Sequence, residues 1–258
     1  MKQRFNKKNK KRRGIYVLPN MFTTVSLFFG FLSIISSLNN EFEKAAISIL
    51  ISCIFDILDG RIARLTNTTS QFGLEYDSLS DLVSFGVAPV IFLFKWTLQS
   101  FGRLGWLACF MYLACGALRL ARFNVYAKSE RDVSYFKGLP IPAAASFISA
   151  MFLFGEAIKK SWNPAFILIS VYVLSFLMVS NIRYVSLKGD EFKYKRPFDI
   201  LVTIVLVFVL VAYKPRLFIP IFIAAYVLSG PVFTLYNLAV TKRIAVIERD
   251  PYEDNRRC

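Results

Sequence analysis

Long apolar runs are the feature that most restricts what this chain can fold into. The 258-residue sequence is 55% hydrophobic, and its charged residues, 19% of the total, gather between the apolar runs. A helix of about 20 apolar residues crosses the hydrocarbon core of a bilayer, and a soluble core could not bury so many runs of that length. The sequence therefore predicts an integral membrane protein of the all-α class, built as a polytopic bundle of transmembrane helices.

One bundle with eight spans is expected. A basic cytoplasmic or interfacial segment over residues 1–18, with a short interfacial helix, precedes the spans. Residues 19–187 hold six spans and residues 188–240 two more, and a charged cytoplasmic tail over residues 241–258 is expected to be disordered. The spans are expected at about 20–38, 43–65, 72–97 and 103–122, then in a fifth helix ending near 158, and at about 163–182, 197–213 and 217–238.

Positive charge is placed asymmetrically along the chain. The net charge is +15, and residues 1–13 contain eight Lys or Arg and no acid. Such a run is also typical of a nucleic-acid-binding arm, but its position directly before an apolar span favours contact with anionic lipids and an orientation signal. With eight spans, most Lys and Arg fall on the side of the two termini. We expect both termini on the cytoplasmic side of the cell (inner) membrane and no nucleic-acid partner.

Four aspartates recur at helical spacing at the boundary between the second and third expected spans. Asp56 and Asp59 share one face of a predicted helix, and Asp77 and Asp81 share one face of the next. Residues 67–70, Asn-Thr-Thr-Ser, form the expected turn between these helices. Two helices joined by a short turn can face each other, so we expect the four carboxylates to converge on the cytoplasmic side.

Converging carboxylates at a membrane boundary would repel one another and would be costly to desolvate without a cation among them. Hard oxygen ligands suit Mg²⁺ or Mn²⁺, and four of them are enough for two ions about 3.5–4 Å apart, the arrangement used for phosphoryl displacement. Gly60, Ala63 and Gly73 lie on the same helix faces and leave room for a ligand. A solvated loop with helix-end aspartates, the alternative, would not need these small residues in register with the acids.

Several kinds of chemistry are excluded by composition. The chain has no histidine, so Ser-His-Asp and Cys-His catalysis and zinc sites built on histidine are absent. Three of the four cysteines lie in apolar segments and none forms a C-x-x-C pair, so disulfides are not expected. A general base is therefore best sought among the carboxylates.

The pattern D-x2-D-G-x2-A-R-x8-G-x3-D-x3-D, complete from Asp56 to Asp81, resembles the signature of the CDP-alcohol phosphatidyltransferases. This resemblance implies a six-span core, outside which the last two spans lie, and a homodimer in the membrane. It also implies displacement of CMP from a CDP-linked lipid by the hydroxyl of an alcohol. Asp56, Asp59 and Asp77 would then be metal ligands. Asp81 would be the base, with a metal contact of its own.

The resemblance also implies a site for CDP-diacylglycerol on the same helices. Asn20 and Thr23, at the cytoplasmic mouth of the first span, are added to this site, although both are equally suited to helix capping. The expected residues are Asn20, Thr23, Asp56, Gly60, Ala63, Arg64 and Gly73.

Stretches outside the signature resemble the bacterial and archaeal phosphatidylserine synthases of that family, which implies L-serine as the acceptor. They cover residues 19–30, 117–124, 136–145 and 179–184. The carboxylate of serine needs a cation near the metal ions. Each cationic candidate is also suited to anchoring on lipid headgroups, and the one amide is also suited to capping a helix. The candidates are Arg119, Arg122, Asn124, Lys137 and Arg183.

Two alternatives remain open at this point. Within the family, the acceptor could be glycerol 3-phosphate, whose dianionic phosphate would want a denser basic cluster. From a different class, acidic residues in spans also mark ion paths, as in a divalent-cation transporter. A transporter is expected to place polar groups near the membrane midplane, whereas these aspartates gather at one face.

Overall fold

The computed structural model describes residues 17–66, 70–127, 136–184 and 197–247, and nearly all of them are helical. Two strands of two residues each, β1 (Phe136–Lys137) and β2 (Arg183–Tyr184), pair in an antiparallel bridge. The all-α class is thus confirmed. The helices are α2 (Val17–Leu38), α3 (Phe42–Leu65), α4 (Gln71–Asp81), η1 (Leu82–Val87), α5 (Ala88–Trp96), η2 (Leu98–Phe101), α6 (Arg103–Ala127), α7 (Ile141–Ala157), α8 (Pro164–Val179), α9 (Pro197–Tyr213) and α10 (Pro215–Ile247).

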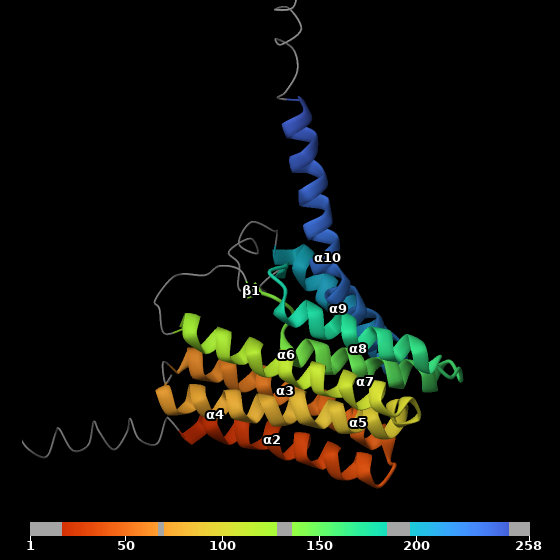
Figure 1. The fold of residues 1–258 in the computed structure, drawn as a ribbon. Helices are drawn as coiled ribbons and strands as arrows, with labels where there is room; N and C mark the ends of the chain where they lie inside the picture. The colour runs from red at the N-terminus through yellow and green to blue at the C-terminus, as the bar shows by residue number, and fades with distance from the viewer. Residues whose placement is uncertain (1–16, 67–69, 128–135, 185–196, 248–258) are drawn as a thin grey trace, which may run out of the picture.

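Helices cover each of the eight expected spans. Helices α2 to α8 lie side by side as a bundle, with α9 and α10 along its edge (Figure 1). Among the described residues, α7 and α8 are apolar but shorter than a bilayer crossing, and four segments are long and apolar enough to cross. A multi-pass membrane protein is therefore supported, while the count of eight spans stays a prediction. The four segments are Asn20–Leu38, Gln71–Trp96, Arg103–Val125 and Pro215–Thr234.

The third expected span is not one regular helix. Helix α4 passes into a π-helical turn, η1, before α5 begins. Pro89 lies in the first turn of α5 and has no backbone N–H to donate to the carbonyl of Phe85. The hydroxyl of the fully buried Tyr112, from α6, donates to that carbonyl instead, at 3.2 Å. A helical irregularity of this kind is common at functional sites, and η1 begins directly after Asp81.

Several expected boundaries shift. Helix α10 continues to Ile247, so the prediction of a disordered tail is wrong for residues 241–247. No proline or glycine interrupts the helix in this stretch. Figure 1 shows this end of α10 projecting beyond the bundle. Helix α6 reaches Ala127, five residues beyond the expected end of the fourth span at about residue 122. The expected interfacial helix falls in residues 1–16 and the end of the tail in 248–258, both outside the described residues.

Small and hydroxylated side chains bring α2, α3 and η1 close together. Ser26 of α2 and Ser52 of α3 exchange hydrogen bonds through their side chains and each other's carbonyls, at 2.8–3.0 Å. Ser84 of η1 donates to the carbonyl of Ser26 at 3.3 Å, and a Cβ on Gly30 would overlap Ser84. Close backbone approach at small residues, supported by hydrogen bonds between helices, is how membrane helices associate. This contact lies beneath the acidic cluster.

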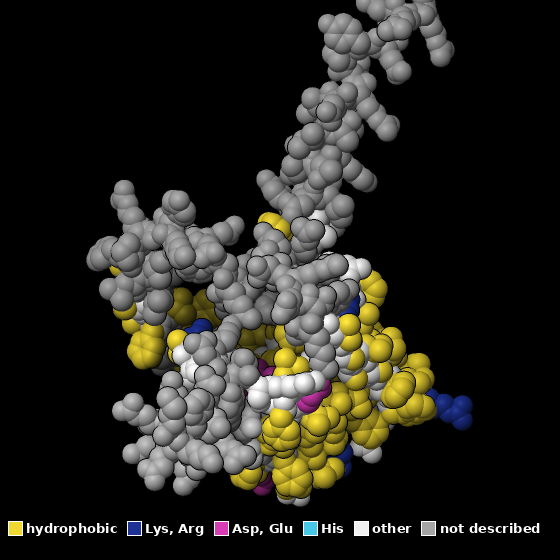
Figure 2. Space-filling model, turned by 90° about the vertical axis from the view of Figure 1, so that its left-hand side faces the viewer, with side chains coloured by type: hydrophobic (Ala, Val, Ile, Leu, Met, Phe, Trp, Pro, Cys, Tyr) yellow, Lys and Arg dark blue, Asp and Glu magenta, His cyan; other side chains and the backbone are white. Residues whose placement is uncertain are grey.

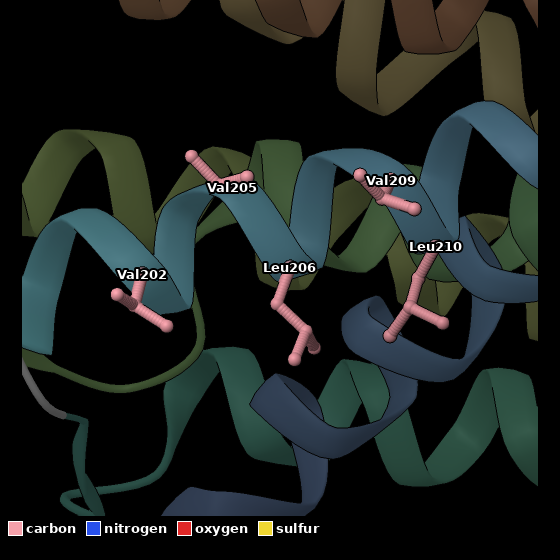
Figure 3. Close-up of a pocket in the computed structure, with 5 residues that line it drawn as sticks. All are labelled: Val202, Val205, Leu206, Val209 and Leu210. Atoms are coloured by element: carbon pink, nitrogen blue, oxygen red, sulfur yellow. The ribbon is translucent and has the colours of Figure 1, made fainter.

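The outer surface of the bundle is apolar. Along α9, five side chains line a groove of about 400 Å³ (Figure 3). About half of the surface of Val205, Leu206 and Val209 is exposed. Contact with acyl chains needs such a surface, because lipid tails are as apolar as the side chains. The lining residues are Val202, Val205, Leu206, Val209 and Leu210.

Candidate active site

A cavity of about 460 Å³ lies where α3 ends and α4 begins, at one end of the bundle. Figure 2 looks onto this end, and among the side chains drawn in colour a few acidic ones lie next to hydrophobic ones. Helices α2, α3, α4, α6 and α7 contribute to the lining. The lining residues are Asn20, Thr23, Asp56, Ile57, Asp59, Gly60, Ala63, Ser70, Gly73, Leu74, Asp77, Ser78, Asp81, Arg119, Leu120, Phe123, Asn124, Pro140 and Pro142.

The aspartates converge as their spacing predicts. One carboxylate oxygen from each of Asp56, Asp59 and Asp77 lies within 4.8 Å of the other two. Asp59 is only 5% exposed, and Oδ1 of Asp77 is buried with no hydrogen-bond partner among the described residues. A buried, unpaired carboxylate oxygen is costly and is what a bound cation would compensate. The donor set is all oxygen, so these residues fit Mg²⁺ or Mn²⁺.

Asp59 is held by a hydrogen bond from a neighbouring helix. Oγ1 of Thr23, in α2, donates to Oδ2 of Asp59 at 2.8 Å, and both side chains are buried. Ser80, one residue before Asp81, donates to the backbone carbonyl of Thr23 at 3.2 Å. Thr23 thus connects the two helices that carry the aspartates.

Asp81 lies at the inner end of the cluster. Its carboxyl group is within hydrogen-bonding distance of the carboxyl group of Asp56, an arrangement that needs a proton or a cation between the two. Arg119 of α6 is close enough to both aspartates for a favourable charge interaction. Its Nε atom is buried without a hydrogen-bond partner among the described residues. Arg119 therefore lies beside the acids but forms no ion pair with them among the described residues, so its guanidinium can bind another anion.

The small residues of the motif all line the cavity. A Cβ on Gly73 would lie 3.1 Å from Oγ of Ser70 and 3.3 Å from Oδ1 of Asn20, tighter than most side chains tolerate. Ser70 caps α4 by accepting a 2.9 Å hydrogen bond from the backbone N–H of Gly73. Gly73 thus lets the beginning of α4 approach Asn20 of α2, which closes one side of the cavity.

The other acceptor candidates lie differently from Arg119. Arg122 donates to the carbonyls of Val179 (3.2 Å) and Ser180 (3.5 Å), which ties α6 to the end of α8. Asn124 lines the cavity, and its amide also pairs with Ser78 of α4 at 3.0–3.1 Å. The hydrogen bonds of Arg122 thus indicate a structural role for its side chain, whereas Arg119 lines the cavity.

The backbones of Lys137 and Arg183 are directly paired in the β1–β2 bridge. Their side chains and that of Arg64 lie outside what the structure describes, so their expected roles stay predictions.

Part of the cavity is lined by residues that the aspartate motif does not predict. Leu120 and Phe123 of α6, with Pro140 and Pro142 at the beginning of α7, add apolar side chains to the lining. The two prolines lie in the Leu-Pro-Ile-Pro sequence that opens α7, where proline is tolerated in the first turn. Leu120 and Phe123 lie one and four residues after Arg119, near the end of α6. Once Arg119 is expected at the site, helical spacing alone predicts that these two residues lie near it as well.

Comparisons with known proteins agree with this geometry. The family model for CDP-alcohol phosphatidyltransferase matches residues 16–180. The chain is 37% identical over 224 residues to the CDP-diacylglycerol–serine O-phosphatidyltransferase of Helicobacter pylori (strain ATCC 700392 / 26695), covering 86% of this chain and 92% of that protein. It is 38% identical to the archaetidylserine synthase of Methanothermobacter thermautotrophicus, covering 70% and 75%. With the Bacillus subtilis CDP-diacylglycerol–serine O-phosphatidyltransferase it shares 33%, covering 66% and 91%. The chain belongs to the CDP-alcohol phosphatidyltransferase family.

Proposed function

We propose that this protein transfers the phosphatidyl group of CDP-diacylglycerol to the hydroxyl of L-serine, giving phosphatidylserine and CMP. The observation that carries the proposal is the convergence of Asp56, Asp59 and Asp77 beside Arg119 in one cavity. The names of the relatives, which include serine transferases from two bacteria and an archaetidylserine synthase, support serine as the acceptor.

Different lining residues of the cavity suit the two parts of the donor, the diacylglycerol and the cytidine diphosphate. Leu120, Phe123 and Pro142 suit the diacylglycerol end, because apolar surface is where acyl chains and glycerol carbons lose least on leaving the bilayer. Gly60 and Gly73 leave the space that a cytidine diphosphate would occupy, and Asn20, Thr23, Ala63 and Arg64 complete the proposed donor site.

Divalent ions held by Asp56, Asp59 and Asp77, with Asp81 adjacent, would polarise the phosphoryl oxygens and stabilise the charge that develops on them. Thr23 fixes the orientation of Asp59 through its 2.8 Å hydrogen bond, so that the carboxylate cannot rotate away when a ligand leaves. Mg²⁺ and Mn²⁺ both fit the donor set, and two ions are proposed.

Asp81 is the proposed base. It accepts the proton of the serine hydroxyl while the serine oxygen forms a bond to the lipid-side phosphorus. The bond from that phosphorus to the oxygen of CMP breaks, and CMP leaves with the electron pair. The position of Asp81 beside Asp56 and Arg119 supports this role, because these two residues belong to the proposed metal and acceptor sites.

Arg119 is the proposed partner of the serine carboxylate. A guanidinium can bind a carboxylate through two parallel hydrogen bonds, and Arg119 is the described cation that lines the cavity. Lys137 and Arg183 remain candidates for a secondary contact. Arg122 is a weaker candidate because it already donates to two carbonyls.

We further propose that the cavity and both termini face the cytoplasm of the inner membrane, since most Lys and Arg lie on that side, and that the protein is a homodimer. Impermeant thiol labelling of the C-terminal Cys258 in spheroplasts and in inverted vesicles tests the orientation. Labelling in spheroplasts would contradict it.

Release of radiolabelled CMP from CDP-diacylglycerol by the purified protein tests the function. We expect release with L-serine and Mn²⁺ or Mg²⁺, no release after chelation, and recovery when either ion is restored. Release of CMP only with glycerol 3-phosphate would support phosphatidyl transfer as the reaction but would contradict serine as the acceptor. Divalent-cation flux into liposomes without CMP release would favour a transporter and overturn the enzyme.

A further inference from the structure

The segment from Gly138 to Pro142 connects the β1–β2 bridge to the beginning of α7 and contributes to the lining of the cavity. Pro140 and Pro142 line the cavity, whereas Leu139 and Ile141, which alternate with them, are fully buried in the core. Neither proline has a backbone N–H. The segment therefore places no unpaired donor at the two positions where its residues line the cavity.

The backbone of this segment is fixed to the end of α8 and the residues that follow it. The N–H of Gly138 donates to the carbonyl of Ile182 at 2.9 Å. The N–H of Leu139 donates to the carbonyl of Leu177 at 3.0 Å. Two hydrogen bonds from adjacent residues fix both the position and the direction of the chain directly before α7 begins.

Gly138 is the residue that allows this close approach. Its φ of +85° lies in the left-handed region, which residues with a side chain rarely adopt. A Cβ at this position would overlap the carbonyl oxygen of Met178 and lie 3.1 Å from that of Ser180. Both oxygens belong to the backbone and cannot rotate away, so a side chain here would move the segment away from the end of α8.

The opposite side of the segment packs on α6. The side chain of Ile141 lies so close to Gly116 of α6 that a Cβ on the glycine would be only 2.6 Å from Cδ1 of the isoleucine. The same helix carries Leu120 and Phe123, two of the apolar residues that line the cavity. The segment is thus held from two sides, by the carbonyls at the end of α8 and by α6.

We propose that Gly138 is a positioning residue for the lipid donor. Gly138 is itself buried and acts through Pro140 and Pro142, whose place in the cavity sets the space for the glycerol and acyl carbons of CDP-diacylglycerol. This role rests on the proposed function, in which Pro142 belongs to the diacylglycerol end of the donor site. It concerns the donor and not the acceptor, because Arg119 and the aspartates lie on other elements.

The test is a steady-state titration of CMP release by the full-length protein against CDP-diacylglycerol and, separately, against L-serine. Gly138→Ala adds one carbon atom where the backbone leaves no room. We expect its KM for CDP-diacylglycerol to rise about tenfold, since one methylene group of apolar contact is worth about 10–200-fold in such a site. Its kcat and its KM for serine should stay close to those of the wild type.

Gly155→Ala is the matched control, because it introduces the same atom near the opposite end of α7. A Cβ there would lie 2.8 Å from Nε1 of Trp162 and 3.1 Å from the carbonyl oxygen of Lys160. We expect Gly155→Ala to lower the unfolding temperature, as Gly138→Ala does, but to keep the wild-type KM for CDP-diacylglycerol.

A second pair of variants acts on the segment from the side of α6. Gly116→Ala should also raise the KM for CDP-diacylglycerol, because the added Cβ pushes against Ile141. Ile141→Val removes the Cδ1 atom that is pushed. The double variant should therefore recover most of the wild-type KM, since residues in contact give non-additive effects. This pair decides the question if Gly138→Ala does not fold.

The outcomes separate the two proposals. A folded wild-type protein that releases no CMP with any alcohol overturns the proposed function and this role with it. An active wild type whose KM for CDP-diacylglycerol is unchanged in Gly138→Ala, or in Gly116→Ala where Gly138→Ala does not fold, overturns the role of Gly138 alone. An equal rise in Gly155→Ala, or a fall in kcat without a rise in KM, would assign the effect to a general loss of packing and also overturn it.

Discussion

The hydroxyl of Tyr112 donates to the carbonyl of Phe85, which lies four residues before Pro89 and has no helical donor from that position. Tyr184 does the same for Val227, four residues before Pro231. In each case a tyrosine from another element satisfies a carbonyl that a proline leaves open inside an apolar bundle. Proline is thus accommodated within a helix at the cost of one dedicated tertiary hydrogen bond.

Tyr112→Phe should therefore destabilise the protein with little effect on chemistry. The ring is retained, but the buried Phe85 carbonyl loses its donor, which costs about 1–3 kcal/mol. Thermal unfolding in detergent measures the effect, and Tyr172→Phe, at a more exposed position on α8, is the matched control. Equal unfolding temperatures for the wild type and Tyr112→Phe would contradict the role of this hydrogen bond.

Thr23→Val should weaken metal binding more than it weakens folding. The substitution keeps the shape of the side chain and removes the donor to Asp59. Loss of such a supporting contact typically costs about 10–100-fold in metal affinity. The Mn²⁺ concentration for half-maximal thermal stabilisation reports the change. Thr24→Val, whose hydroxyl bonds to Asn20 and Tyr76 rather than to an aspartate, should bind Mn²⁺ as the wild type does.

Asp81→Asn should separate catalysis from metal binding. Removing a general base lowers turnover by about 10²–10⁴-fold, whereas the three converging oxygens of the other aspartates remain. We expect Mn²⁺ still to raise the unfolding temperature of Asp81→Asn and to leave that of Asp77→Asn unchanged. An active Asp81→Asn enzyme would remove this residue as the base.

Arg119 and Arg122 should behave differently although they lie one turn apart. Arg119→Lys removes the planar pair of donors from the cavity, and the KM for serine should rise about tenfold or more, since hydrogen bonds to charged groups are the stronger ones. Arg122→Gln should mainly lower the unfolding temperature, because Arg122 connects α6 to the end of α8. A serine KM raised more by Arg122→Gln than by Arg119→Lys would reverse the assignment.

Periodicity and spacing predict a large part of this molecule. Apolar runs placed eight helices close to their observed positions, and steps of three and four residues predicted that Asp56, Asp59 and Asp77 would meet. Both signals are local, since they depend only on which residues share a helix face. The cavity follows from the same faces, because its glycines are in register with its acids.

What could not be predicted depends on contacts between distant segments. The π-helical turn after Asp81 depends on Pro89 together with a hydroxyl from α6. The carbonyls that bind Arg122 lie at the end of α8, 57 and 58 residues further along the chain. Such pairings arise only after the helices have packed.

The cavity that holds the aspartates is also lined by the apolar side chains of Leu120, Phe123, Pro140 and Pro142, and this has a kinetic consequence. One substrate of such a cavity is dissolved in a two-dimensional phase and the other in bulk water. The rate should therefore depend on the mole fraction of the lipid donor in a micelle or vesicle, and not on its amount per volume. Dilution with inert detergent would slow the enzyme at constant total donor, while the response to serine would follow its ordinary molar concentration.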